Sequence, residues 1–332
     1  MAISGPASFI PTITEFLAHW LQCNQALAPQ PFLVRLPDNS PVTRAQFVTT
    51  RDALQNQQGV VQGCLTDQQL ARGTINLQKV VLLERFNQFL ARLDGYYINT
   101  NFMEARPFAP SLSDGQENFT QPMVALMKLW GKVNTGPAPT GVTLPLVLPG
   151  AMSAGSFSSL VSALQFAYAD ELDKEQNVTL ARADRNLIQT NAYAVMKAYR
   201  ENLPGSAVAA FPALIETMPR LTPLPGHTPE AVNSSAIYLA PNSSKVVYDA
   251  SPDAMLESYQ LRGNVGDDYN DEDAVVIATN APGAPREFIT PFGLNQPGAK
   301  VALKVYVTLT TGNEAGSAAM FVERPATVQL AA

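Results

Sequence analysis

This 332-residue chain has few of the side chains that most active sites use. It contains two cysteines, Cys23 and Cys64, and two histidines, His19 and His227. No Cys or His pair has the spacing of a metal site, and neither histidine has a context typical of a catalytic triad. We therefore expect no catalytic residue, no cofactor and no structural metal, and we interpret the protein as non-enzymatic.

The same four residues have ordinary structural interpretations. Cys23 and Cys64 are expected to be reduced thiols, with Cys23 packed as a small hydrophobic residue. His19 stands beside Trp20 on the flank of an expected helix, where a solvated or hydrogen-bonded surface histidine is favoured over a ligand.

Charge is also scarce, because only 15% of the residues are charged and the net charge is −6. From Leu221 onward there are six basic and twelve acidic residues, so the last third carries the whole −6 and the preceding part is neutral. Neither part offers the basic stripe that binds phosphate backbones, which makes nucleic acid an unsuitable partner. A helical surface of low charge suits contact with protein, including other copies of this chain.

Long apolar runs are missing as well, so no membrane span is expected. The N-terminus has no Lys or Arg before Arg35 and no apolar segment of signal-peptide form. The default expectation is a cytoplasmic protein, with export by a non-classical route left open.

What the chain does contain is a repeat at a fixed offset of 110 residues. The stretch from Phe47 to Gly95 returns as Phe157 to Gly205, and Trp20 returns as Trp130. The matches include Ala53-Leu54-Gln55 with Ala163-Leu164-Gln165, Leu70-Ala71-Arg72 with Leu180-Ala181-Arg182, and Asn76-Leu77 with Asn186-Leu187. Two copies of one helical unit are therefore predicted, over residues 1–110 and 111–218.

Each copy combines a short helix carrying a tryptophan with a long helix. No Gly or Pro interrupts Ser156 to Asn202, which predicts one helix of about 45 residues. In the first copy Gly59 and Gly63 leave open a bend or a split into a hairpin. Ser40 and Ser153 are the expected helix N-caps.

The four helices are expected to pack as one bundle with pseudo-twofold symmetry. Trp20, Trp130, Phe47 and Phe157 are its predicted core anchors. The other core candidates are Leu54, Leu70, Leu77, Val81, Leu93, Leu164, Leu180, Leu187, Val195 and Leu203.

A proline-rich linker at residues 219–234 separates the helices from a different pattern at residues 235–326. Seven short strand patterns follow one another there at spacings near ten, which predicts a β-sandwich. They lie at residues 236–239, 245–248, 259–262, 274–278, 287–290, 302–309 and 319–322.

The sandwich sequence resembles the fibronectin type III module over about 90 residues, from Ala236 to Pro325. The resemblance rests on the stretches 246–253 with 259–262, 293–298 and 305–317. Tyr248 stands where that family usually has a core Trp, and Val301 where it has the corner Tyr, so a somewhat different core is expected. The resemblance implies a binding or spacer module and carries over no catalytic residue.

One acidic run in this part, at residues 267–273, has two interpretations. Asp267, Asp268, Asp271 and Asp273 could supply the oxygen ligands of a calcium site. The run lacks the EF-hand spacing and its glycine, so a solvated, negatively charged loop is favoured over a calcium loop.

The pattern as a whole favours a structural protein that self-assembles, as an oligomer or filament, through its helical repeats, with the sandwich displayed outside. Apolar segments such as 144–148 and the apolar chain ends are the expected contacts. The alternative is a binding adaptor whose sandwich holds a protein or glycan partner.

Overall fold

The computed structural model describes residues 3–98 and 100–325, and its chain forms two compact units. Unit 1 comprises Met1–Thr66 with Val178–Ala332, and unit 2 comprises Asp67–Asn177. This division differs from that of the sequence repeats, because the long helix of each repeat runs from one unit into the other. Ala326, the last residue of the expected sandwich, and the chain ends at 1–2 and 327–332 lie outside the described residues.

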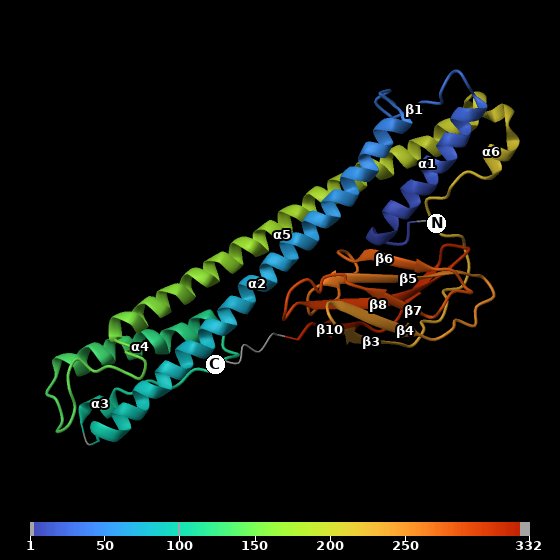
Figure 1. Ribbon diagram of the computed structural model, residues 1–332. Helices are drawn as coiled ribbons and strands as arrows, with labels where there is room; N and C mark the ends of the chain where they lie inside the picture. Colours follow the sequence, from blue (N-terminus) through green and yellow to red (C-terminus); the bar gives the residue numbers. More distant parts are fainter. Residues whose placement is uncertain (1–2, 99, 326–332) are drawn as a thin grey trace. The chain divides into compact units, whose positions relative to one another are not determined.

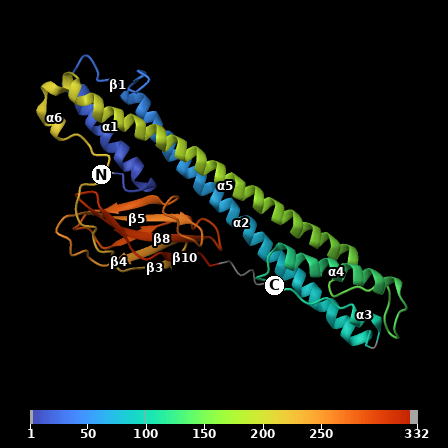
Figure 2. The same cartoon turned by 180° about the vertical axis from the view of Figure 1, so that it is seen from behind.

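Two long helices, α2 and α5, belong to both units (Figures 1 and 2). The helical elements in chain order are η1 (Pro6–Ser8), α1 (Phe9–Ala26), α2 (Arg44–Tyr96), α3 (Asn101–Glu104), α4 (Gln116–Thr135), α5 (Ala154–Asn202), η2 (Leu203–Gly205), η3 (Ala207–Ala210) and α6 (Pro212–Glu216). α2 is continuous through Gly59 and Gly63, so the hairpin alternative is wrong. None of the described helices is both long enough and apolar enough to cross a bilayer.

Equivalent residues cap the two long helices. Ser153 accepts a hydrogen bond from Ser156 N at 3.1 Å, as expected for an N-cap. In α2 the cap is Thr43, whose hydroxyl accepts from Gln46 N at 3.2 Å while Gln46 Oε1 accepts from Thr43 N at 2.8 Å. This is a capping box, and it replaces the expected cap at Ser40, which lies before the helix.

The helical core of unit 1 lies where α1 packs between the first part of α2 and the last part of α5. Trp20 is at its centre, with ring centroids 6.1 Å from Phe47 and 5.2 Å from Tyr199. Ile13, Phe16, Leu54, Val195, Met196 and Leu203 complete this core. Of the four helices of the predicted bundle, three therefore contribute to this core, together with Leu203 of η2 and Val208 of η3.

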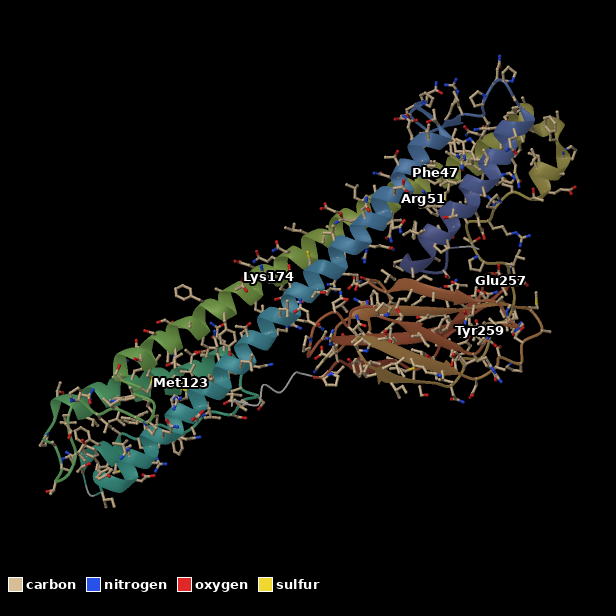
Figure 3. All side chains as sticks on the ribbon, in the orientation of Figure 1. Phe47, Arg51, Met123, Lys174, Glu257 and Tyr259 are labelled. Carbon is tan, nitrogen blue, oxygen red and sulfur yellow. The ribbon has the colours of Figure 1, made fainter. Side chains whose placement is uncertain are left out.

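Unit 2 has a core of the same construction, with α4 packed against the last part of α2 and the first part of α5. Trp130 lies 4.9 Å from Phe89 and 5.9 Å from Phe157, measured between ring centroids. Met123, Leu126, Leu82, Phe86, Leu93 and Leu164 surround them. Figure 3 labels Phe47 and Met123 on α2 and α4.

Five of the predicted core residues are wrong. Leu54, Leu93, Leu164, Val195 and Leu203 are buried, but Leu70, Leu77, Val81, Leu180 and Leu187 are exposed. The reason is that α1 and α4 have 18 and 20 residues against 53 and 49 for α2 and α5. Away from the short helices the long ones bury one narrow stripe, containing Ala71 and Ala181, and their outer positions remain in contact with solvent.

The C-terminal part of unit 1 is a β-sandwich of two antiparallel sheets, and it contains all seven predicted strand patterns. Its described strands are β3 (Ser234–Leu239), β4 (Ser243–Tyr248), β5 (Leu256–Val265), β6 (Val275–Asn280), β7 (Glu287–Thr290), β8 (Lys300–Leu309), β9 (Glu314–Gly316) and β10 (Met320–Glu323). One sheet has the order β3-β4-β7, and the other has the order β10-β8-β5-β6 with β9 beside β8. A two-residue ladder pairs β1 (Val34–Arg35) with β2 (Pro41–Val42) near the start of α2.

Other aromatic residues fill the part of the sandwich core where the fibronectin type III family usually has a Trp. Tyr248 is buried, 4.7 Å from Tyr259 and 5.2 Å from Phe288 between ring centroids. Val301 is fully buried beneath Gly293, whose φ is +66° and where a Cβ would come within 2.4 Å of Val301 Cγ1. A larger side chain at either position would need rearrangement of the loop that follows β7.

The linker at residues 219–233 has no regular secondary structure, but backbone hydrogen bonds hold it at several points. Leu221 O accepts from Ile3 N at 2.9 Å, and Leu224 N donates to Thr311 O at 2.8 Å. Asn313 Nδ2 also donates to Leu224 O at 3.0 Å. The segment is thus tied both to the N-terminal segment and to the β8–β9 turn.

Candidate functional site at the junction of helices and sandwich

The four aspartates of the acidic run do not converge on one point. Asp273 points toward α5, Asp271 accepts a hydrogen bond from Tyr306, and Asp267 lies 3.9 Å from Lys300 Nζ. Asp268 is exposed. Among the described residues no three His, Cys, Asp or Glu side chains form a group that could hold a metal.

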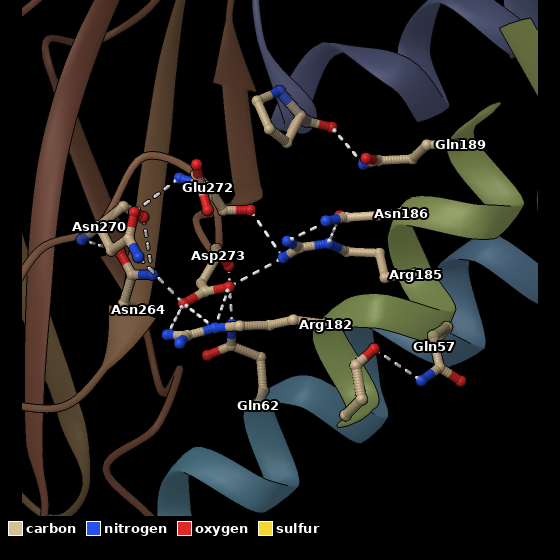
Figure 4. Close-up of polar contacts among 12 residues, drawn as sticks. Gln57, Gln62, Arg182, Arg185, Asn186, Gln189, Asn264, Asn270, Glu272 and Asp273 are labelled. Atoms are coloured by element: carbon tan, nitrogen blue, oxygen red, sulfur yellow. Dashed lines mark hydrogen bonds and ion pairs between the residues drawn. The ribbon is translucent and has the colours of Figure 1, made fainter. Parts of the chain in front are cut away.

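Asp273 instead forms a buried ion-pair cluster with two arginines of α5 (Figure 4). Its side chain is 1% exposed. Arg185 NH1 donates to Asp273 Oδ1 at 2.9 Å and to Glu272 O at 2.7 Å. Arg182 donates to both carboxylate oxygens, from Nε at 3.1 and 3.0 Å and from NH2. The expectation of a fully solvated acidic loop is therefore wrong at Asp273.

Gln62 of α2 adds a second link between the helices and the sandwich. Its Nε2 donates to Asp273 O at 2.8 Å, and its Oε1 accepts from Val265 N at 3.0 Å. One side chain thus bonds backbone groups of the two segments that flank the loop between β5 and β6. Within unit 1, α2 and α5 together fix the position of this loop.

The charged groups of this cluster have hydrogen-bond partners, which matters because an unpaired buried charge is strongly destabilising. Asn270 Nδ2 donates to Asp273 Oδ2 at 3.3 Å, and Asn186 Oδ1 accepts from Arg185 NH2 at 3.1 Å. The hydrogen bonds to Asp273 raise the pKa of Arg182, so this guanidinium remains charged at every ordinary pH. We name Gln62, Arg182, Arg185 and Asp273 the junction cluster.

Of the four junction residues, only Asp273 has a sequence context that pointed to a site, the acidic run at residues 267–273. The repeat holds a usable signal, because Arg185 stands 110 residues after Ile75, and both positions are buried. A charged residue at a position that is apolar in the other copy indicates a partner supplied from outside the helices.

A second polar cluster lies inside the helical core of unit 1. His19 is buried, not on the surface as expected, and its Nε2 is 2.7 Å from Leu214 O. Since a carbonyl only accepts, Nε2 carries the proton and Nδ1 accepts from Tyr199 OH at 2.7 Å. Cys23 Sγ lies 3.4 Å from the same hydroxyl. The three side chains form one connected chain of hydrogen bonds.

Burial determines the ionisation of this His19–Tyr199–Cys23 chain. Desolvation lowers the pKa of His19 and raises the pKa of Cys23 and of Tyr199. All three groups are therefore held neutral, and all three are sealed from solvent. A thiol that is neutral and inaccessible is a poor nucleophile. We therefore interpret these three side chains as part of the packed core. Cys64, which is half-buried, is also a free thiol.

His227 lies elsewhere, near the start of the sandwich. Its Nε2 contacts Asp253 Oδ2, and this hydrogen bond lowers the pKa of Asp253. The imidazole itself is exposed.

The predicted anchors Trp20 and Trp130 are both fully buried, and each fixes the extended segment that follows its helix. Trp20 Nε1 donates to Phe32 O at 3.0 Å, while Asn24 Oδ1 accepts from Phe32 N at 2.9 Å. Trp130 Nε1 donates to Leu146 O at 3.1 Å, while Asn134 Oδ1 accepts from Leu146 N at 2.8 Å. Phe47 and Phe157 are buried beside the respective tryptophans.

Comparison with solved structures gives matches that each cover about a third of this chain. No protein-family model matches the sequence, and a search of curated proteins gives no match. Among solved structures, the chain is similar to a Fn3-like protein from Clostridium thermocellum, with 20% identity over 30% of this chain and 96% of that one, at a TM-score of 0.25. The fn3 domain of human contactin 1 has 17% identity over 32% of this chain and 85% of that one, at 0.26. A human FNIII domain has 25% identity over 31% of this chain and 83% of that one, also at 0.26.

Proposed function

We propose that this chain is a non-enzymatic structural protein that self-assembles, as an oligomer or filament, through its helical repeats. The sandwich, fixed to α2 and α5 by the junction cluster, is displayed outside that contact. We infer further that the two repeats are copies of one helical unit, which would explain why the Trp–Asn clamp and the Phe–Trp contact occur in both units.

The observation that carries the proposal is a repeated pair of exposed leucines on the long helices. Leu70 and Leu77 of α2 are 49% and 72% exposed, and their equivalents Leu180 and Leu187 of α5 are 64% and 61% exposed. Single exposed leucines need no explanation. Two leucines kept at solvent-facing positions in both copies, two helical turns apart on one stripe, are better explained by a partner surface.

Neighbouring positions support a protein contact on these stripes. On α2, Val80 and Val81 extend the exposed apolar stripe beyond Leu77. On α5, Ala183 is exposed between Leu180 and Leu187. Exposed apolar stripes suit the core of a protein interface, and Asp184 is an exposed charge within the α5 stripe. Because a stripe occurs in each unit, one copy can contact two others, as an open assembly requires.

The experiment is light scattering on the full-length chain over a wide range of concentrations. We expect association in the wild type and its loss in Leu77→Gln with Leu187→Gln, with the unfolding free energy changed by less than about 1 kcal/mol because both side chains are exposed. Gln69→Ala with Gln176→Ala, elsewhere on the same helices, is the control. A wild type that remains monomeric at all concentrations contradicts the proposal.

The alternative function, a binding adaptor, draws on one observation in unit 1. A cleft of about 570 Å³ lies between the N-terminal segment at Ile3–Ala7, the linker and the sandwich. Arg262, Asp271, Tyr306 and Glu314 line it. A cleft of this size with several polar groups could hold part of a peptide or glycan chain.

Capture of a specific protein or glycan by an immobilised full-length monomer would favour the adaptor. In that case Tyr306→Ala and Glu314→Ala should weaken capture, while Leu77→Gln with Leu187→Gln should leave it unchanged. Capture that the cleft variants do not alter would exclude this cleft as the site.

A further inference from the structure

The outer face of the β3–β4–β7 sheet carries an exposed apolar patch. Because side chains alternate along a strand, Val246, Tyr248 and Phe288 enter the core while their neighbours face outward. The outward residues include Ile237 at 60%, Leu239 at 39%, Val247 at 44% and Ile289 at 58% exposure. We name these four residues the sheet patch.

The strand register places the patch in adjacent rows. Ile237 pairs with Lys245, and Lys245 pairs with Ile289, so these three side chains lie side by side across the sheet. In the next outward row Val247 pairs with Ser235 on one side and Glu287 on the other. Within the sandwich, β3 and β4 lie on the side far from α1 in both views (Figures 1 and 2), so the helices of unit 1 leave this face open.

One ion pair crosses the patch, and it has a useful symmetry property. Lys245 Nζ lies 2.7 Å from Glu287 Oε2, with the side chains 35% and 42% exposed. The outward positions of β3, β4 and β7 thus hold one positive and one negative charge, next to each other, among apolar and serine residues. If a second copy faces this sheet across a twofold axis between the two charges, each Lys245 meets the other copy's Glu287.

We propose that the sheet patch is an isologous contact surface on which a second copy of this chain docks, sandwich against sandwich. We choose a second copy as the partner because of charge complementarity. The face carries one positive and one negative side chain, so two copies of it can pair both charges. A partner of one charge sign would find only half of the ion pair matched, whereas a second copy matches both halves and all four apolar residues. The inference builds on the proposed self-assembly but uses a different surface.

The size of the face sets the expected strength. β3 and β4 have six residues and β7 has four. With strands spaced about 4.8 Å apart, the face is at most roughly 20 Å by 15 Å. A standard interface buries about 800 Å² on each partner, so this contact by itself should be weak, with a dissociation constant of roughly 10 to 1,000 µM. In an assembly already joined through the helices, the sheet patches of neighbouring copies are held at a high effective concentration, so this weak contact would form.

The test is charge reversal in the full-length chain, followed by sedimentation velocity at increasing concentration. In the Leu77→Gln, Leu187→Gln background, we expect a weak monomer–dimer equilibrium. Lys245→Glu should weaken it at least about tenfold, because carboxylates then face carboxylates across the contact. Lys245→Glu combined with Glu287→Lys restores opposite charges across the axis and should return the dissociation constant to within about threefold of the starting value.

A matched control is available on the other sheet. Lys300 lies 3.8 Å from Glu323 in an exposed ion pair, so Lys300→Glu changes net charge by the same amount away from the patch. It should leave dimerisation unchanged. Melting temperatures should be similar for all variants, since exposed ion pairs contribute little to stability.

The outcomes separate this inference from the proposed function. A helix-variant background that remains monomeric at millimolar concentration, or a double charge swap that associates no better than Lys245→Glu, overturns the sheet contact. Loss of all association in Lys245→Glu with intact helix leucines supports the sheet contact and removes the helical one. Substituting Ile237→Ser and Ile289→Ser together should also weaken the dimer. Because these substitutions do not change the charge of the sheet patch, charge repulsion cannot be the cause of that effect.

Discussion

The helical cores of the two units use the same framework and differ in polarity at its centre. Around Trp20 in unit 1 stand His19, Cys23 and Tyr199; the equivalents around Trp130 in unit 2 are Leu129, Val133 and Phe89. Both sets are buried. The unit 1 residues are joined in one chain of hydrogen bonds that ends at Leu214 O of α6, whereas the unit 2 residues only pack.

The difference shows under what condition a core of this construction can contain polar groups. A buried polar atom is destabilising unless it has a partner, and in unit 1 each group of the His19–Tyr199–Cys23 chain has one. The same logic applies along the long helices. Arg185 in unit 1 meets Asp273, while Ile75 at the equivalent position of unit 2 is a plain apolar residue. In these two cases the polar residue lies where unit 1 has an additional segment, α6 or the sandwich, to meet it.

The largest expected effect tests the shared framework. Trp20→Ala and Trp130→Ala should each lower the unfolding free energy by about 3 to 5 kcal/mol, because both side chains are fully buried and hydrogen-bonded. Urea denaturation followed by circular dichroism measures this loss. The milder Trp20→Phe and Trp130→Phe leave one tryptophan each, so fluorescence then reports on one unit at a time. Losses below about 1 kcal/mol at both sites would show that neither tryptophan is a core anchor.

The next effect tests the junction cluster, which unit 2 lacks. Asp273→Asn should destabilise the chain by about 3 kcal/mol, because Arg185 keeps its buried charge and loses its carboxylate. Asp268→Asn, on the same loop but exposed, is the control and should change stability by less than about 0.5 kcal/mol.

A double-mutant cycle sharpens this test. Adding Arg185→Ile, which copies Ile75, to Asp273→Asn should recover part of the lost stability by removing the unpaired charge. If the two losses are simply additive, then Arg185 and Asp273 are not coupled and the cluster does not hold the sandwich to α5.

A smaller effect comes from exchanging the central aromatic residues. Tyr199→Phe copies Phe89 but removes the 2.7 Å hydrogen bond to His19 Nδ1, which keeps only the weaker contact with Cys23 Sγ at 3.7 Å, so a loss of about 1 to 2 kcal/mol is expected. Phe89→Tyr places a hydroxyl among apolar side chains and should be destabilising by about 1 to 3 kcal/mol. Thermal unfolding of both variants measures the two values, and a gain of stability in Phe89→Tyr would show that unit 2 has a hydrogen-bond partner there.

The smallest effect is a pH dependence confined to unit 1. Burial lowers the folded pKa of His19 below its ordinary 6.5, so between the two values the unfolded chain binds a proton that the native chain does not. Stability is then fully present above pH 6.5 and falls as the pH drops below that value.

His19→Leu, which copies Leu129, should remove this component of the pH dependence. Urea midpoints of the two single-tryptophan proteins between about pH 8 and pH 5 provide the measurement. An equal pH dependence in unit 2, reported by Trp130, would assign the effect to other groups.

Much of the fold is predictable because it depends on local features of the sequence. The seven strand patterns, the long uninterrupted α5 and the 110-residue offset follow from side-chain alternation, the absence of Gly and Pro, and identity between copies. The junction cluster was not predicted, because Gln62, Arg182 and Asp273 are separated by 120 and 91 residues and no local pattern records which of them meet.

The sequence by itself determined the long helices, the linker, the strand patterns and the small number of cysteines and histidines, since each depends on the residues themselves and on their neighbours along the chain. Only the tertiary structure decided which repeated leucines are buried. Leu54 and Leu70 look alike in the sequence, yet Leu54 is buried within reach of α1 and Leu70 is open to solvent. It also decided that Asp273 meets arginines while Asp268 remains in water. Both outcomes depend on which segment lies opposite, and a side chain's own neighbours in sequence do not contain that information.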